Sequence, residues 1–151
     1  MTLDEINQRA FAFLSGVVYG PPELIAAALR PTPDDFAAVF VGEAAHTAAA
    51  AYASFWAKPP GALTRSAGAQ IRVFTQLSQN IVESSEFPGG YAKIAHLLAP
   101  DHAWCRFKLV GNGGRDVLAY DGLVARGERW AWFPKPWRAF TTPTAAEPID
   151  N

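Results

Sequence analysis

The stretch from His102 to Phe140 reads HAWCRFKLVGNGGRDVLAYDGLVARGERWAWFPKPWRAF and holds four of the chain's five tryptophans. Apolar and polar residues alternate over Ala103–Val110 and again from about Asp116 to Ala125, which predicts two neighbouring strands. A third strand carries the tryptophan pair at 130 and 132 and ends before two prolines, because proline cannot donate a ladder hydrogen bond. The stretch therefore predicts a three-stranded antiparallel meander.

The first turn of this meander is predicted at Gly111–Gly114, where glycines supply the positive φ angles of a tight hairpin. Pairing across that turn brings Phe107 near Leu118 and Cys105 near Tyr120. One face is then apolar and consists of Cys105, Phe107, Leu109, Leu118 and Tyr120. The opposite face is mixed and consists of Trp104, Arg106, Lys108, Val117, Ala119 and Asp121. We expect the apolar face to meet the core.

The second turn is predicted as a three-residue loop, Ala125–Gly127, with Gly127 in the left-handed conformation. This loop places Trp130 opposite Gly122 and puts both strand tryptophans on the core face. A two-residue loop would shift the parity and turn both indoles to the other face. We prefer the first register, and the alternative stays open at this point.

The rest of the chain is predicted to be mostly helical before the meander. A Thr2–Glu5 capping box begins the first helix, and Thr32 followed by Pro33 begins a long one. The predicted elements are helices from Thr2 to near Tyr19, Glu23–Leu29, Pro33 to about Ala57 with a weak point at Gly42, and about Tyr91–Leu98, and a strand at Gln70–Leu77. The fold class is α+β, with N-terminal helices packed on a curved antiparallel sheet. Residues 1–140 form one domain, and 141–151 form an extended or mobile tail.

Composition narrows the function classes. A chain of 151 residues, half of them hydrophobic, is long enough for one domain with a sizeable core. A net charge of −1 argues against a nucleic-acid binder, which would carry a basic face. The longest low-charge stretch, residues 44–57, is too short to span a bilayer, and the N-terminus lacks the pattern of a secretory signal. We therefore expect a soluble cytoplasmic protein that binds neither nucleic acid nor membrane.

No motif demands a metal or a cofactor, and none is predicted. The three histidines, His46, His96 and His102, lack metal-ligand spacing. Cys105 lies in mid-strand on the core face, where a thiol is normally inert. Gly111–Gly114 leads into a strand without the Lys-Ser/Thr of a phosphate loop, so we interpret it as a hairpin turn.

The candidate binding residues are Arg106, Tyr120, Asp121 and Trp132. The predicted register puts Arg106 diagonal to Asp121 on one face, as a cross-strand ion pair or as a polar patch able to hold a small acid. Tyr120 and the tryptophans either pack in the core or line a pocket between the sheet and the long helix. The residues leave both pairs of alternatives open, and no catalytic residue is assigned.

Helices followed by a strand, a short helix and an aromatic meander resemble the NTF2-like superfamily of cone-shaped α+β domains. Tyr120-Asp121-Gly122-Leu123 with Gly127-Glu128-Arg129-Trp130-Ala131-Trp132 is similar to the last hairpin of many members, in which a tryptophan packs into the cone. The resemblance covers residues 33–138. It implies a curved sheet and a family that contains isomerases, dehydratases and hydrolases as well as binding and dimerisation modules. The catalytic His-Asp and Tyr-Asp arrangements of its enzymes have no clear counterpart here.

We expect a non-catalytic binding or interaction module that takes a protein partner or a small apolar or acidic ligand. The alternative is a small-molecule-binding protein or NTF2-like enzyme with a pocket between the long helix and the sheet. A homodimer through the second sheet face is also predicted, because that face is expected to carry an apolar patch. The patch consists of Trp104, Val117, Ala119, Leu123 and Phe133.

Overall fold

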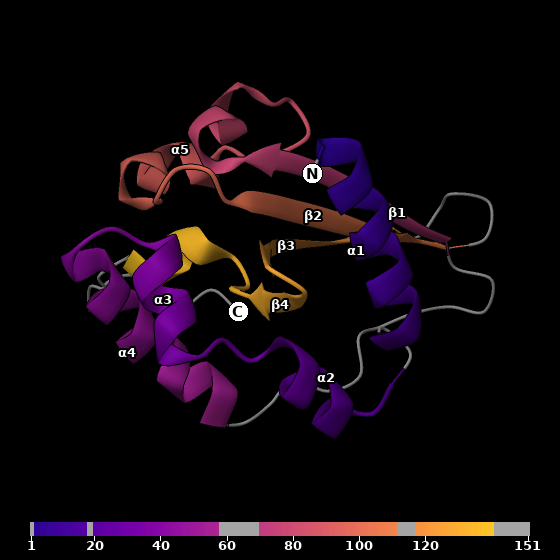
Figure 1. Cartoon of the computed structure of the whole chain (residues 1–151), viewed down its shortest axis with the longest axis horizontal. Coiled ribbons are helices and arrows are strands. Elements are labelled where there is room, and N and C mark those ends of the chain that lie inside the picture. The colour runs from indigo at the N-terminus through magenta and orange to yellow at the C-terminus, as the bar shows by residue number, and fades with distance from the viewer. Residues whose placement is uncertain (1, 18–19, 58–69, 112–116, 141–151) are drawn as a thin grey trace.

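The computed structural model describes residues 2–17, 20–57, 70–111 and 117–140, and it is an α+β fold as predicted (Figure 1). Its α-helices are α1 (Leu3–Val17), α2 (Pro22–Leu29), α3 (Pro33–Val39), α4 (Glu43–Ala57) and α5 (Gly90–Ile94). Short 3-10 helices follow at η1 (Ser78–Glu83), η2 (Ala95–Leu97) and η4 (Pro136–Phe140). The strands are β1 (Gln70–Leu77), β2 (Ala103–Val110), β3 (Val117–Arg126) and β4 (Arg129–Trp132).

The four strands form one antiparallel sheet in the order β1-β2-β3-β4, so the predicted meander is confirmed as β2, β3 and β4. The bounds of β1 and β2 agree with the predicted strands residue for residue. The order leaves β1 and β4 as the two edge strands. The resemblance to the NTF2-like superfamily stays a prediction.

The predicted pairing of β2 with β3 is wrong by two residues. Leu118 pairs with Leu109 and not with Phe107, and Tyr120 pairs with Phe107 and not with Cys105. The connection is longer than the predicted four-residue turn, because Val110 pairs with Val117. A two-residue slip moves each side chain along the strand but keeps it on its face, so the predicted faces survive. Most of the Gly111–Gly114 turn lies outside the described residues.

Two further departures from the predicted register cancel each other. A β-bulge sets Asp121 and Gly122 together opposite Arg106, and Gly122 has a φ of 93°. The second turn has two residues, since Arg126 pairs with Arg129, and Gly127 has the positive φ of 63° expected at the first position of a type II′ turn. Each of these two changes shifts the register by one residue and so moves the side chains that follow to the other face of the sheet. Trp130 and Trp132 therefore still face the core, but Trp130 lies opposite Ala125 and not over Gly122.

The predicted long helix is broken into α3 and α4. Its start is confirmed, because Thr32 and Asp35 form a reciprocal capping box around Pro33. The break falls at Phe40, which leaves the helix to bridge Leu98, and at Gly42, which has a φ of 50°. The predicted weak point at Gly42 thus ends the helical run, because the residue there adopts a left-handed conformation that glycine tolerates.

The other predicted helices are confirmed with small shifts at their ends. Thr2 accepts a hydrogen bond from the Glu5 amide and caps α1, which ends at Val17, and α2 begins one residue earlier than predicted. The short helix predicted near residues 91–98 is present as α5 followed by η2. Strand β1 is followed directly by the 3-10 helix η1.

Each face of the sheet is covered in part by the chain itself. Helix α1 packs on the face that carries Cys105, Phe107, Leu123 and Trp132, which we call the α1 face (Figure 1). Tyr91 of α5 packs on the opposite face, which carries Trp104, Arg106 and Asp121 and which we call the α5 face. The chain folds back after β4, since Trp137 contacts Tyr91 and Phe140 contacts Phe40.

The apolar patch proposed for a homodimer is corrected by this packing. Trp104, Leu123 and Phe133 are fully buried within the chain, and Leu123 lies on the α1 face because of the bulge. Only Ala119 of the patch is an exposed described side chain, and the Val117 side chain is not described. The patch therefore gives the predicted homodimer no interface. The predicted tail, 141–151, lies outside the described residues.

Candidate functional site

Arg106 and Asp121 meet at the β-bulge, as their predicted positions on one face require. The Arg106 Nε lies 3.3 Å from the Asp121 Oδ1, and the two side chains are 19% and 7% exposed. The bulge brings them together because Arg106 faces both Asp121 and Gly122. This ion pair is not on an open solvent face, since Phe87 and Tyr91 pack over the same region.

Burial of this pair disfavours the charged form of the Asp121 carboxyl. Burial raises the pKa of the Asp121 carboxyl, although the Arg106 charge and the hydrogen bond from Tyr91 at 3.5 Å oppose the shift. Arg106 donates to the Glu86 carbonyl at 2.9 Å, but its Nε is buried and makes no hydrogen bond. Because one buried donor has no hydrogen bond, the attraction between the two charges does not fully offset the cost of removing them from water.

Tyr120 and Trp132 lie on the α1 face, so the sheet separates them from Arg106 and the Asp121 side chain. Tyr120 stacks on Phe107 with a centroid distance of 5.1 Å, and Trp132 lies 6.3 Å from Tyr120. The link between the two groups is the backbone, because the Trp132 Nε1 donates to the Asp121 carbonyl at 2.9 Å. The structure thus brings the four candidates together as two pairs on opposite faces, and their role in binding stays a prediction.

A second buried carboxylate, Asp35, was not among the predicted site residues. It is fully buried and accepts hydrogen bonds from Arg129 at 2.8 Å, from Arg126 at 3.0 Å and from the Thr32 amide at 2.8 Å. Burial alone would raise the pKa of Asp35, but the hydrogen bonds from Arg129, Thr32 and Arg126 outweigh it and lower the pKa. The sequence shows the cap but not the two arginines, which come from the β3–β4 hairpin.

The nucleophile and metal candidates are placed as follows. Cys105 is fully buried beside Thr75, with 3.4 Å between Sγ and Oγ1, and burial raises the pKa of its thiol to about 12. His46 and His96 are not buried, whereas burial and the nearby Arg126 charge lower the pKa of His102. Within the ranges that the structure describes, no three metal-binding side chains gather. A protonated, buried thiol is a poor nucleophile.

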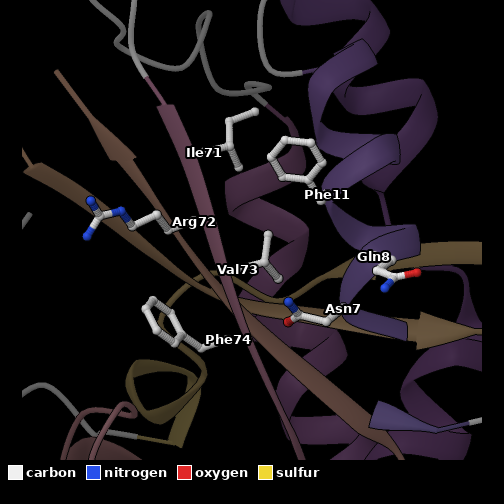
Figure 2. A pocket seen from close by; sticks show the side chains of 7 residues that line it. All are labelled: Asn7, Gln8, Phe11, Ile71, Arg72, Val73 and Phe74. Atoms are coloured by element: carbon white, nitrogen blue, oxygen red, sulfur yellow. The ribbon is translucent and has the colours of Figure 1, made fainter. Parts of the chain in front are cut away.

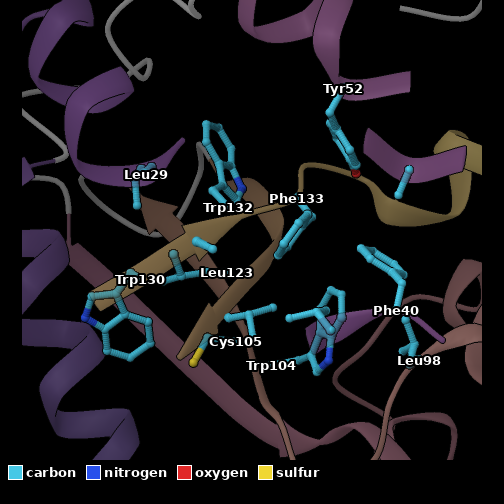
Figure 3. Close-up of a cluster of buried hydrophobic side chains, with 14 of the residues drawn as sticks. Leu29, Phe40, Tyr52, Leu98, Trp104, Cys105, Leu123, Trp130, Trp132 and Phe133 are labelled. Carbon is cyan, nitrogen blue, oxygen red and sulfur yellow. The ribbon is translucent and has the colours of Figure 1, made fainter. Parts of the chain in front are cut away.

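The space between α4 and the sheet is filled by aromatic side chains (Figure 3). Tyr52 contacts Phe133 and donates to the Pro134 carbonyl at 2.8 Å, while Trp56 contacts Trp132. The pocket expected between the long helix and the sheet is therefore replaced here by packed rings. A hollow of about 220 Å³ lies instead between α4 and the segment that leads from α2 into α3, and it is lined by Arg30, Pro31, Pro33, Phe36, Ala49, Tyr52, Ala53 and Trp56.

A larger groove of about 540 Å³ runs between α1 and the edge strand β1 (Figure 2). It is lined by Asn7, Gln8, Phe11, Ile71, Arg72, Val73 and Phe74. Figure 2 shows Ile71 and Val73 on the side of α1, while Arg72 and Phe74 point the opposite way. Phe11 is 49% exposed at the helix side of the groove. The groove thus offers apolar surface directly beside a strand edge.

Sequence reasoning missed this groove, although one signal for it was present. Phe11 lies off the apolar stripe of the first helix, which follows Leu3, Ile6, Ala10, Phe13, Leu14 and Val17. A large aromatic side chain on the polar side of a helix is unusual enough to suggest a contact there. Nothing in the sequence shows that β1 is an edge strand, because this depends on how the whole sheet is ordered.

Comparisons with protein-family models, with curated proteins and with solved structures find no match to this chain. A search of the described residues for a helix of the length and apolarity needed to cross a bilayer finds none.

Proposed function

We propose that this protein is a non-catalytic interaction module that binds an extended polypeptide segment along the β1 edge. The observation that carries the proposal is the combination of an edge strand with the adjoining apolar groove. Addition of a strand to an exposed sheet edge is a common mode of peptide recognition, in which main-chain hydrogen bonds supply affinity and side-chain pockets supply specificity.

The backbone of β1 alternates between groups that pair with β2 and groups that point outward. The Ser78 amide donates to the His102 carbonyl at 2.9 Å, directly after the last β1–β2 pair, Leu77 with Ala103. In an antiparallel ladder every second residue faces the partner strand, so the even-numbered residues of β1 pair with β2. The amides and carbonyls of Ile71, Val73 and Thr75 then point outward, and no strand in the described part of the chain pairs with them.

The chain itself satisfies one outward group, at the end of the strand. The Leu77 amide donates to the Gln76 Oε1 at 2.9 Å, in the place of a strand partner. The central outward amides have no equivalent side-chain acceptor among the described residues. Unpaired amides and carbonyls in a row form a template for another strand. An extended segment beside Ile71–Thr75 would satisfy them and lie over the groove.

The test is a random-peptide selection, followed by measurement of the Kd of the recovered peptides for matched variants. Val73→Pro removes an outward amide without removing a β1–β2 hydrogen bond, and Val73→Ala keeps that amide as the control. We expect the proline variant to bind at least about tenfold more weakly than the alanine variant. The reason is that proline loses a main-chain hydrogen bond to the peptide and places a ring where the peptide backbone would lie. Equal binding by the two variants, with both folded by circular dichroism, would contradict the proposal.

A second candidate is a small-molecule-binding protein, favoured by the 220 Å³ hollow beside α4. Its walls are mostly apolar, and Arg30 supplies a cation among them. This composition suits a small apolar acid. A thermal-shift screen of such acids tests it, because a ligand of the folded state raises the melting temperature, and Arg30→Gln should abolish the shift. Shifts that persist in Arg30→Gln would argue against this site.

A further inference from the structure

The side chains on the two sides of the β1 edge differ in chemistry. On the α1 face, Ile71 and Val73 lie beside Phe11, and this side is apolar. On the α5 face, Arg72 of β1 pairs directly with Lys108 of β2. A strand added to β1 would present its own side chains alternately to these two faces.

The Arg72–Lys108 pair places two cations side by side. Like charges directly opposite each other across two strands repel. No carboxylate of the described residues lies within salt-bridge distance of either side chain, since the ion pairs there involve other residues. The Lys108 Nζ lies 5.2 Å from the ring centroid of Phe74, which keeps this charge near the strand edge. A carboxylate from a partner strand would relieve the repulsion.

From these two faces we infer that the preferred partner of the β1 edge is an extended segment in which apolar and acidic residues alternate. Its apolar side chains lie against Phe11, Ile71 and Val73, and its carboxylates lie beside Arg72 and Lys108. The inference rests on the proposed function and adds the chemical class of the partner. Arg72 is exposed, so its charge is accessible at the edge where such a strand would lie.

The test compares three synthetic peptides that share the same apolar residues at alternate positions and carry Glu, Gln or Lys at the others. We expect the Glu peptide to bind about tenfold more tightly than the Lys peptide, with the Gln peptide between them. Raising the NaCl concentration from about 0.05 M to about 0.5 M should reduce this preference, because the charges lie at the surface.

Charge reversal supplies the matched variants. Arg72→Glu should abolish the preference between the Glu and Lys peptides, because the edge then carries one cation and one carboxylate. Lys93→Glu, at an exposed lysine in the last turn of α5, should leave the preference unchanged. Equal affinity of the wild-type protein for the Glu and Lys peptides would overturn the acidic partner while leaving strand addition intact. Binding of none of the peptides, together with a failed random selection, would overturn both.

A second copy of the chain is the competing occupant of this edge. Analytical ultracentrifugation of the wild-type protein and of Val73→Pro distinguishes the two cases. We expect a monomer in both. A wild-type dimer that Val73→Pro dissociates would assign the edge to self-association and overturn the inference of an acidic peptide partner.

Discussion

The two edge strands of the sheet differ in length and in cover. Strand β4 has four residues, three of them buried, and α2 packs against it. The Phe133 amide, directly after β4, continues the pairing with β3 by donating to the Gly122 carbonyl at 2.7 Å. Strand β1 has eight residues, none of them fully buried, and its central amides point outward beside a groove. The same sheet thus has one edge built into the core and one edge with no strand beside it in the described part of the chain.

This difference shows why an edge position alone does not assign a binding role. Proteins shorten or cover strand edges because an open edge invites pairing with another chain. The β4 edge follows this rule, whereas β1 is long and relies on Arg72 as its exposed charge. We interpret the exception as functional, and changes at the two edges should therefore affect different properties, stability at β4 and binding at β1.

The largest expected effect is on the β4 side. Trp130→Ala should lower the free energy of unfolding by about 3–5 kcal/mol, because it leaves a cavity where the indole stacks on Phe13. Val73→Ala at the other edge should cost about 1 kcal/mol, since that side chain is only half-buried. Urea denaturation measures both. Similar costs at the two positions would remove the contrast between the edges.

The next effect concerns Gly122, the bulge glycine of β3 that lies opposite the residue after β4. A Cβ at Gly122 would overlap the Phe133 carbonyl, and the residue has a positive φ, so Gly122→Ala should cost about 3 kcal/mol. Gly127 also has a positive φ, but no described atom lies within 4 Å of the place that a methyl group there would take. Gly127→Ala should therefore cost only about 1–2 kcal/mol. Equal melting temperatures for the two variants would show that Phe133 does not pack against Gly122.

Asp35 of α3 accepts hydrogen bonds from two arginines of the β3–β4 hairpin, and its replacement should have a moderate effect on stability. Asp35→Asn should lower the free energy of unfolding by about 1.5–3 kcal/mol at neutral pH, because the arginines lose a charged acceptor. The pKa of Asp35 is lowered in the fold, so its stabilisation is complete above the ordinary value of 3.8 and is lost as the pH falls through the folded pKa. A difference between wild type and variant that persists unchanged at the lowest pH would contradict this account.

The smallest effect on stability is expected at the open edge. Phe11→Ser should change the free energy of unfolding by less than about 0.5–1 kcal/mol, because half of the side chain is already exposed. It should nevertheless weaken peptide binding, whereas Leu24→Ser, a control of similar exposure on α2, should not. The Kd values of a selected peptide for the two variants provide the check. Equal binding by both would place the peptide away from the groove.

Local patterns predicted much of the fold. Alternation and flanking turn residues were enough for the bounds of β1 and β2, and the Thr32 cap was visible in the sequence. The bulge at Asp121–Gly122 was not visible, because alternation does not show that Gly122 adopts a left-handed conformation. The tryptophans reached the predicted face only because the two-residue turn restored the parity that the bulge had inverted.

The candidate sites were predicted less well, for a physical reason. Arg106 and Asp121 lie on neighbouring strands, so the meander itself implied their contact. The Asp35 cluster and the groove join segments that are distant in sequence, since Arg129 and β1 each meet a helix from the first third of the chain. Such contacts depend on the packing of the whole domain, which no local periodicity encodes.

Amide hydrogen exchange, measured residue by residue with and without the alternating apolar–acidic peptide, tests the central claim most directly. In the free protein, we expect the Ile71 and Val73 amides to exchange faster than those of Arg72 and Phe74, which face β2. Addition of the peptide should protect Ile71 and Val73 and leave Ala131 of β4 unchanged. Protection of Ile71 and Val73 already in the free monomer, or no change at these amides on saturation with a bound peptide, would contradict the assignment of β1 as the binding edge.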